Sequence, residues 1–141
     1  MNSSFYLVML AAFSLGLWTV FHKLASTKIN PIIGAIIVSV AAVIVGVILA
    51  LSQIKLDQVQ ITYWGVFFVV LAGVFAFGAD YFILKSYGSG LEVSIVGPIV
   101  IGGSIAVASI VGFAMGDKIT LLKILGILLI IGGSSILSIY A

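Results

Sequence analysis

Long apolar runs separated by short polar segments dominate the sequence. The clearest pair fills residues 91–141, where one run extends from Leu91 to Met115 and a second ends at Tyr140. A helix rises about 1.5 Å per residue, so runs of about 20 residues match a hydrocarbon core roughly 30 Å thick. The pattern at this end of the chain therefore predicts a helical hairpin that spans a membrane.

The same pattern predicts five spans, at about residues 5–24, 31–52, 61–84, 91–115 and 121–140. Pro31 suits the first turn of the second span, and Tyr63 and Trp64 resemble an aromatic belt at one end of the third. The first span lacks a basic leader and is too long for a signal peptide, so we expect a retained helix. Continuous apolar runs lack the alternation of a barrel strand. We predict an all-α, polytopic membrane protein, with residues 1–141 forming a single transmembrane domain.

Composition agrees with a membrane protein. The chain is 63% hydrophobic and 7% charged, and its mean hydropathy is +1.43, whereas a soluble domain needs far more surface charge. Its six basic residues are scattered lysines, so a pI near 9.0 indicates no nucleic-acid patch and we expect no such partner. We expect lipid contact and a multi-pass location in the cell (plasma or inner) membrane.

The lysines divide evenly between the two sides of the membrane. Because five spans place the two termini on opposite sides, each loop can be assigned to one side. The side of the N-terminus carries Lys55, Lys118 and Lys123, and the other carries Lys23, Lys28 and Lys85. The positive-inside rule then gives no preferred orientation. Either a partner or the insertion history fixes the orientation, or the chain inserts both ways.

An acid, Asp80, lies inside the third predicted span. A central Asp costs about 2.5–3.5 kcal/mol on insertion scales, which makes it a functional candidate. Small residues on the same helical face (Ala72, Gly73 and Ala76) favour an orientation into the bundle. A structural role is also open, because Lys85 is close enough along the chain to be an ion-pair partner.

Helix direction brings further polar side chains to the end of the bundle where Asp80 lies. An imidazole ordinarily titrates between pH 5 and 8, so His22 could share a proton with Asp80. Trp18, one turn earlier, could stack on a flat or cationic substrate. Structural alternatives exist: Glu92 can complement a helix dipole, His22 can be solvated and Trp18 can be a packing residue. The predicted substrate-binding or coupling residues are Asp80, His22, Trp18, Tyr81 and Glu92.

The fourth span contains Gly97 and Pro98 near its start. Pro98 removes the helical hydrogen bond to the carbonyl of Ser94 and should kink the helix. In a membrane a freed carbonyl is tolerated only beside protein or a wet cavity. We predict a hinge or cavity-lining point at Gly97 and Pro98, with a static bend as the alternative.

Small residues recur at helical spacing in the last two spans. Such residues let helix backbones approach closely in lipid, either between two copies or within one chain. The predicted dimer or helix-packing residues are Ser104, Ala108, Gly112 and Gly116 in the fourth span and Gly126 and Gly133 in the fifth.

Motifs of enzymes are missing from the sequence. It has no Cys, one His, no phosphate-binding glycine loop and no metal-ligand spacing. We therefore expect no enzyme, no catalytic residue, no cofactor and no metal, and no transport driven by ATP through this chain alone.

The chain resembles one EamA-type repeat of the drug/metabolite transporter superfamily. The matching motifs are Gly97-Pro98, Gly116-Asp117-Lys118-Ile119-Thr120, Gly126, Gly132-Gly133, and Trp18 followed by Lys23. The sequence departs from the repeat at Asp117, which replaces the usual Glu, and at Thr19, which replaces the usual Gly.

The resemblance implies a transporter fold. Members commonly carry two such repeats in inverted orientation, ten helices in all, and these 141 residues contain one. With the balanced lysines, it predicts a secondary transporter of small metabolites that works as an antiparallel, dual-topology homodimer by alternating access. The alternatives are a subunit of a heterodimer with a related five-helix chain, and an accessory or structural membrane protein without transport.

Overall fold

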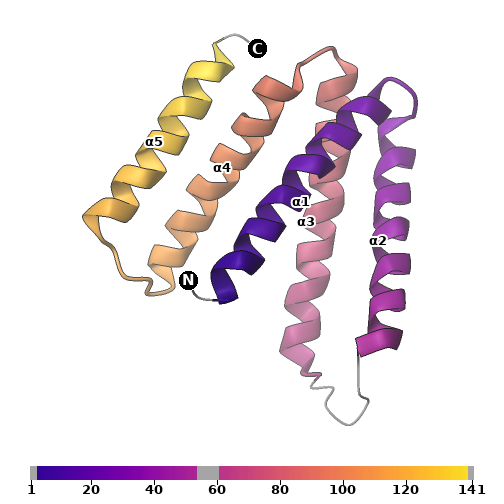
Figure 1. The fold of residues 1–141 in the computed structure, drawn as a ribbon, viewed down its shortest axis with the longest axis horizontal. Helices are drawn as coiled ribbons and strands as arrows, with labels where there is room; N and C mark the ends of the chain where they lie inside the picture. The colour runs from indigo at the N-terminus through magenta and orange to yellow at the C-terminus, as the bar shows by residue number, and fades with distance from the viewer. Residues whose placement is uncertain (1–2, 54–60, 140–141) are drawn as a thin grey trace. The chain divides into compact units, whose positions relative to one another are not determined.

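The computed structural model describes residues 3–53 and 61–139, with side chains from 6 to 52 and from 61 to 139. Its elements are α1 (Ser3–Ser26), α2 (Pro31–Gln53), α3 (Tyr63–Gly88), α4 (Val93–Ala114) and α5 (Leu121–Ser138), as Figure 1 shows. No strand occurs in these ranges, so the predicted all-α fold with five helices is confirmed. The ends of the described helices differ from the predicted ends by at most four residues. Lys55 and the predicted end of the last span at Tyr140 lie outside the described residues.

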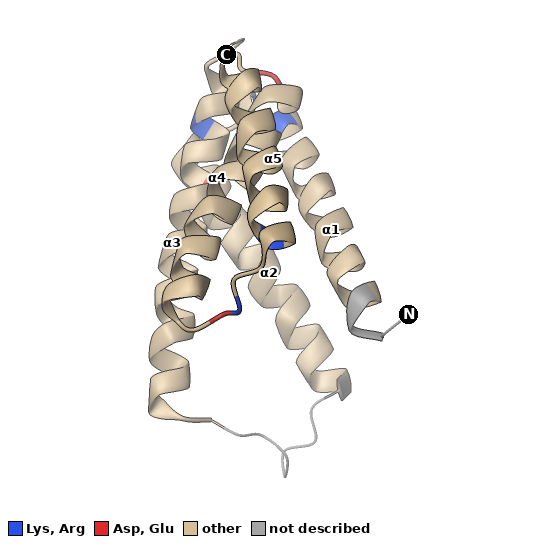
Figure 2. Ribbon diagram, turned by 90° about the vertical axis from the view of Figure 1, so that its left-hand side faces the viewer, with Lys and Arg blue, Asp and Glu red and all other residues tan. Residues whose placement is uncertain are grey.

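All five helices are long and apolar enough to cross a membrane. The candidate spans contain 18 to 26 residues, with mean hydropathies from 1.6 to 3.1. Figure 2 shows how little of the ribbon carries Lys, Asp or Glu. The chain is therefore a multi-pass membrane protein.

The chain divides into two compact units, which we describe separately. Unit 1 comprises residues 1–21 and 89–141, and unit 2 comprises residues 22–88. In unit 2, α2 and α3 pack side by side, and their buried apolar residues are Ala35, Ile83, Leu84 and Tyr87. In unit 1, α4 packs along α5, and Val96 is buried with Gly97 and Gly102. The prediction of a single transmembrane domain stays a prediction.

Polar residues at the predicted breaks start three of the helices. The side chain of Asn30 accepts a hydrogen bond from the backbone N–H of Ile32 at 3.0 Å, and Pro31 occupies the first position of α2. Thr62 accepts from the N–H of Gly65 before α3, and Thr120 accepts from the N–H of Lys123 at the start of α5. Each side-chain oxygen satisfies a backbone donor that the first helical turn leaves without a partner.

A glycine turn ends α4 and leads to α5. Gly116 has a φ of +101°, its N–H bonds to the carbonyl of Phe113 at 3.1 Å, and the N–H of Asp117 bonds to the carbonyl of Gly112 at 3.0 Å. These two bonds form a Schellman motif. Because α4 ends at Ala114, Gly116 lies beyond the helix in the turn that follows it, and its role in dimer or helix packing stays a prediction.

Candidate functional site

A buried pair of polar side chains lies between α1 and α3 within unit 2. The Nε2 atom of His22 is 3.0 Å from Oδ1 of Asp80, and the two side chains are 4% and 8% exposed. His22 is near the end of α1, and Asp80 lies on α3 two turns before that helix ends. The structure thus brings together two of the predicted site residues.

Buried residues flank the pair along both helices, and Thr19 and Ser26 lie one turn to either side of His22 on α1. Ile83 and Leu84, which follow Asp80 on α3, are also buried. A neutral imidazole can donate an N–H to the carboxylate, and an imidazolium can form an ion pair with it. The arrangement therefore places an imidazole and a carboxyl group in direct contact with little exposure of either side chain.

Asp80 pairs with His22 and not with Lys85 in the part of the chain that the structure describes. Lys85 is exposed, and its Nζ lies 5.8 Å from the centroid of the Tyr81 ring. Tyr81 is half-buried and also contacts Phe82 edge to face. Tyr81 therefore faces a lysine, and the structural alternative of an Asp80–Lys85 pair does not describe this fold.

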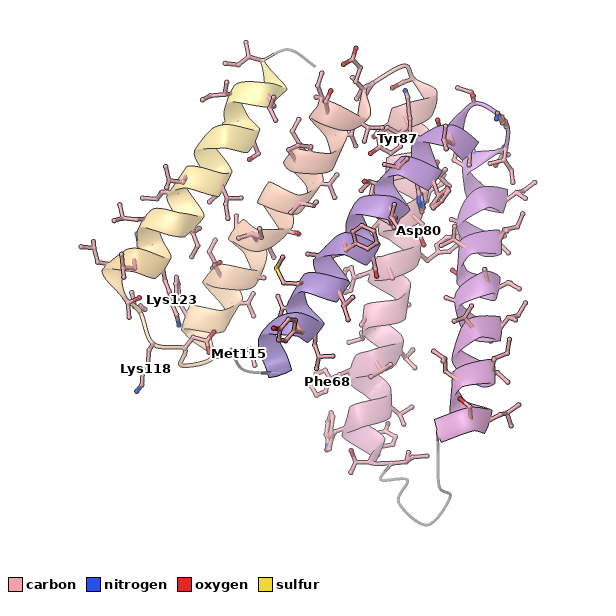
Figure 3. The ribbon with its side chains drawn as sticks, viewed as in Figure 1. Phe68, Asp80, Tyr87, Met115, Lys118 and Lys123 are labelled. Atoms are coloured by element: carbon pink, nitrogen blue, oxygen red, sulfur yellow. The ribbon has the colours of Figure 1, made fainter. Side chains whose placement is uncertain are left out.

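Tyr87 is a further polar residue near this site. It is on the same face of α3 as Asp80, two helical turns further along, and Figure 3 labels both. Its side chain is fully buried, and its hydroxyl has no hydrogen-bond partner among the described residues. Lys23 donates to the backbone carbonyl of Tyr87 at 3.4 Å, and its Nζ lies 5.6 Å from the ring centroid. Tyr87 was not among the predicted site residues, although its spacing of seven from Asp80 was a usable signal.

Trp18 and Glu92 belong to unit 1. Trp18 is half-buried on α1, one turn before His22 along the same helix. Glu92 is the exposed residue before α4, where its carboxylate accepts a hydrogen bond from the Ser94 hydroxyl at 3.2 Å and makes no side-chain cap. The roles of both residues in binding stay predictions.

Gly97 and Pro98 line a groove within unit 1. The groove has a volume of about 640 Å³ and is bounded by α1, α4 and α5. Gly97 is buried and Pro98 is exposed, and α4 remains helical on both sides of them. The predicted cavity-lining position thus faces a groove, while a hinge at this point stays a prediction.

The family assignment comes from comparison with known proteins. The model of the EamA-like transporter family matches residues 2–139, nearly the whole chain. The chain belongs to the EamA-like transporter family. This match confirms the single EamA-like repeat of the drug/metabolite transporter superfamily that the motifs indicated. No curated protein and no solved structure matches the chain significantly.

The small residues of this EamA-like chain fall into different environments. A Cβ added at Gly102 would lie 2.5 Å from Oγ of Ser134, so Gly102 is the position where α4 approaches α5 most closely among the glycines of α4. A Cβ at Gly112 would lie 2.7 Å from Oδ2 of Asp117, which makes Gly112 part of its own α4–α5 turn. A Cβ added at Gly126 or Gly133 would have no neighbouring atom within 4 Å among the contacts considered.

Ser104 and Ala108 are exposed on α4 of this EamA-like chain. Gly102 was not among the packing residues predicted in the fourth span, which begin at Ser104. A bulky residue at Gly112 would meet the Asp117 side chain in the turn of the same chain. The dimer role of the stripe therefore stays a prediction.

Proposed function

We propose that this chain is a secondary transporter of small molecules in which Asp80 and His22 act as the coupling or recognition pair. The observation that carries the proposal is the burial of both side chains between apolar helices. Ionisable groups inside membrane spans are costly and mark substrate or proton pathways in many transporters. Membership of a transporter family supports the same conclusion.

The working unit that we propose is an antiparallel, dual-topology homodimer that works by alternating access. Transporters with inverted repeats bind substrate between two halves of opposite orientation, and an oppositely inserted copy would supply the second half. The even division of six lysines between the two sides supports insertion in both orientations. The proposed partners are thus a second copy of this chain, the surrounding lipid and a small-molecule substrate.

Two other functions compete with this proposal. A heterodimer with a related chain would commonly show opposite lysine biases in its two subunits, and the balanced lysines weigh against it. An accessory membrane protein without transport would have no need for a buried His22–Asp80 pair, so the pair weighs against that alternative.

The first experiment replaces the proton-carrying group and keeps its shape. Asp80→Asn retains a hydrogen-bonding side chain beside His22 but cannot exchange a proton. We expect the variant to lose pH-dependent uptake of a panel of radiolabelled metabolites into proteoliposomes, compared with and without an imposed pH gradient. Asp117→Asn, the same change in the exposed α4–α5 turn, is the matched control. Normal pH-dependent uptake by Asp80→Asn would remove Asp80 from the mechanism.

The second experiment measures orientation. The chain has no Cys, so one Cys placed after Tyr140 can be labelled in intact cells with a membrane-impermeant reagent. If the chain inserts in both orientations in similar amounts, we expect about half of the Cys to be labelled in intact cells and all of it after permeabilisation. Complete labelling or none before permeabilisation would contradict dual topology and favour a partner chain.

A further inference from the structure

Lys23 directly follows His22 in the sequence and reaches the last turn of α3 within unit 2. Its Nζ atom donates to the backbone carbonyl of Tyr87 at 3.4 Å and lies 5.6 Å from the centroid of the Tyr87 ring. We propose that Lys23 is a positioning residue, which holds the end of α1 against the end of α3 and thereby keeps His22 in contact with Asp80. The inference rests on the proposed function for the role of the pair, but the contact itself can be measured without transport.

The place that Lys23 occupies favours a cation. Tyr87 is the next-to-last residue of α3, and backbone carbonyls in the last turn of a helix have no donor from the helix itself. The last turn of a helix also carries a partial negative charge. Lys23 lies in the last turn of α1 and contacts the last turn of α3. Its ammonium group therefore satisfies an acceptor and offsets the charge of two helix ends.

The ring of Tyr87 provides a second contact for the same ammonium group. An ammonium within about 6 Å of a ring centroid is attracted to the face of the ring. The side chain of Tyr87 is fully buried, and Lys23 is half-buried. Lys23 is thus attached to one residue of α3 through both its backbone and its side chain.

The contacts between the two helix ends follow one another in order along both helices. Residues 22 and 23 meet residues 80 and 87, and a Cβ added at Gly88 would lie 3.4 Å from the backbone carbonyl oxygen of Ser26. Helix ends open more readily than the middle of a packed helix. Because His22 lies only four residues before the end of α1, opening of that end would separate His22 from Asp80. Loss of the Lys23 contact should therefore make the pair open more often.

The test measures how often the His22–Asp80 contact opens. His22 is the only His of the chain, so nitrogen-15 labelling of histidine gives a single imidazole in a protein purified without a histidine tag. Exchange of the imidazole proton with water is followed by NMR in lipid nanodiscs at constant pH, and exchange of a buried proton requires local opening. Lys23→Met keeps the unbranched stem but removes the donors and the charge. We expect about 3- to 10-fold faster exchange in this variant, the factor that one net hydrogen bond supplies.

Matched variants separate positioning from general stability. Lys23→Arg keeps donors and charge and should exchange at close to the wild-type rate. Lys28→Met makes the same change at an exposed lysine in the α1–α2 turn and should leave the rate unchanged. Gly102→Ala disturbs the contact between α4 and α5 and should also leave it unchanged. Lys23→Gln, which is shorter and uncharged, replaces Lys23→Met if circular dichroism shows that Lys23→Met does not fold.

Two results would overturn the proposal. Exchange at the wild-type rate in Lys23→Met would mean that the pair does not depend on Lys23. Equally faster exchange in Lys28→Met or Gly102→Ala would mean that general stability, and not positioning, controls the contact. Failure of the proposed function is a separate outcome, because normal pH-dependent uptake by Asp80→Asn would remove Asp80 from transport without changing these exchange rates.

Discussion

The energetic coupling between His22 and Asp80 is the prediction that follows most directly from the structure. Their side chains are 3.0 Å apart and less than a tenth exposed, so water cannot take the place of a lost partner. Asp80→Leu leaves a buried imidazole without its partner, and His22→Phe leaves a buried carboxyl group. Each single change should cost about 1–3 kcal/mol, the usual penalty for a buried polar group without a partner.

The double variant removes both polar groups and leaves none without a partner. Its destabilisation should therefore be smaller than the sum of the single effects by at least about 1.5 kcal/mol, the low end for hydrogen bonds to charged groups. That figure lies near the maximum of about 1.7 kcal/mol for interhelical hydrogen bonds in a membrane protein, where the average is about 0.6 kcal/mol. A coupling of this size is more than tenfold in the folding equilibrium.

The assay is reversible unfolding of the four proteins in bicelles, by steric trapping, from which a double-mutant cycle is calculated. A control cycle combines Ser14→Ala and Ser52→Ala, two exposed serines on α1 and α2 that each bond to their own helix. The control pair should be additive within about 0.3–0.5 kcal/mol. The same additivity for His22 and Asp80 would refute the argument that they stabilise one another.

Two further predictions concern glycines of α4 and the turn that follows it, measured as shifts in the thermal unfolding temperature in detergent. Gly102→Ala should destabilise by about 1–3 kcal/mol, because its Cβ would meet Ser134 on α5, whereas Gly103→Ala has open space and should stabilise by about 0.5–1 kcal/mol. Destabilisation by both, or by neither, would contradict the observed rotation of α4 against α5. Gly116→Ala should cost about 1–2 kcal/mol because of the φ of +101°, and Gly116→Asn should cost less. Equal effects of the two Gly116 variants would show that backbone conformation is not the cause.

Much of the fold could be predicted because a membrane-spanning helix must be both apolar and long enough to cross the hydrocarbon core, and both properties can be read from the sequence. Five apolar runs became five helices, and polar residues such as Thr120 stand at their starts. The largest error was at the end of α3, predicted at Leu84 and observed at Gly88. Hydropathy falls at Lys85, but backbone hydrogen bonding continues past the apolar run, so the helix extends beyond the part that lipid requires.

The site was predictable only as far as helix direction determines it. Because successive spans run in opposite directions, the order of the spans placed His22 at the same end as Asp80. The order alone could not decide whether His22 or Lys85 is the partner of Asp80. Residues five apart do not share a helical face, which explains why Lys85 contacts the ring of Tyr81 instead. Gly102 was missed because the rotation of α4 about its own axis decides which small residues meet α5, and no single-helix pattern contains that angle.

The hydroxyl groups of this chain have a consequence for its motion. Thr19, Ser39, Ser104 and Ser134, on four different helices, all donate to carbonyls of their own helices. Among the described residues, these four hydroxyl groups are bonded within their own helices, so a change in the packing between helices would not break these bonds. The buried His22–Asp80 contact is of the opposite kind, because it joins side chains from two different helices and any separation of residues 22 and 80 would break a buried polar contact.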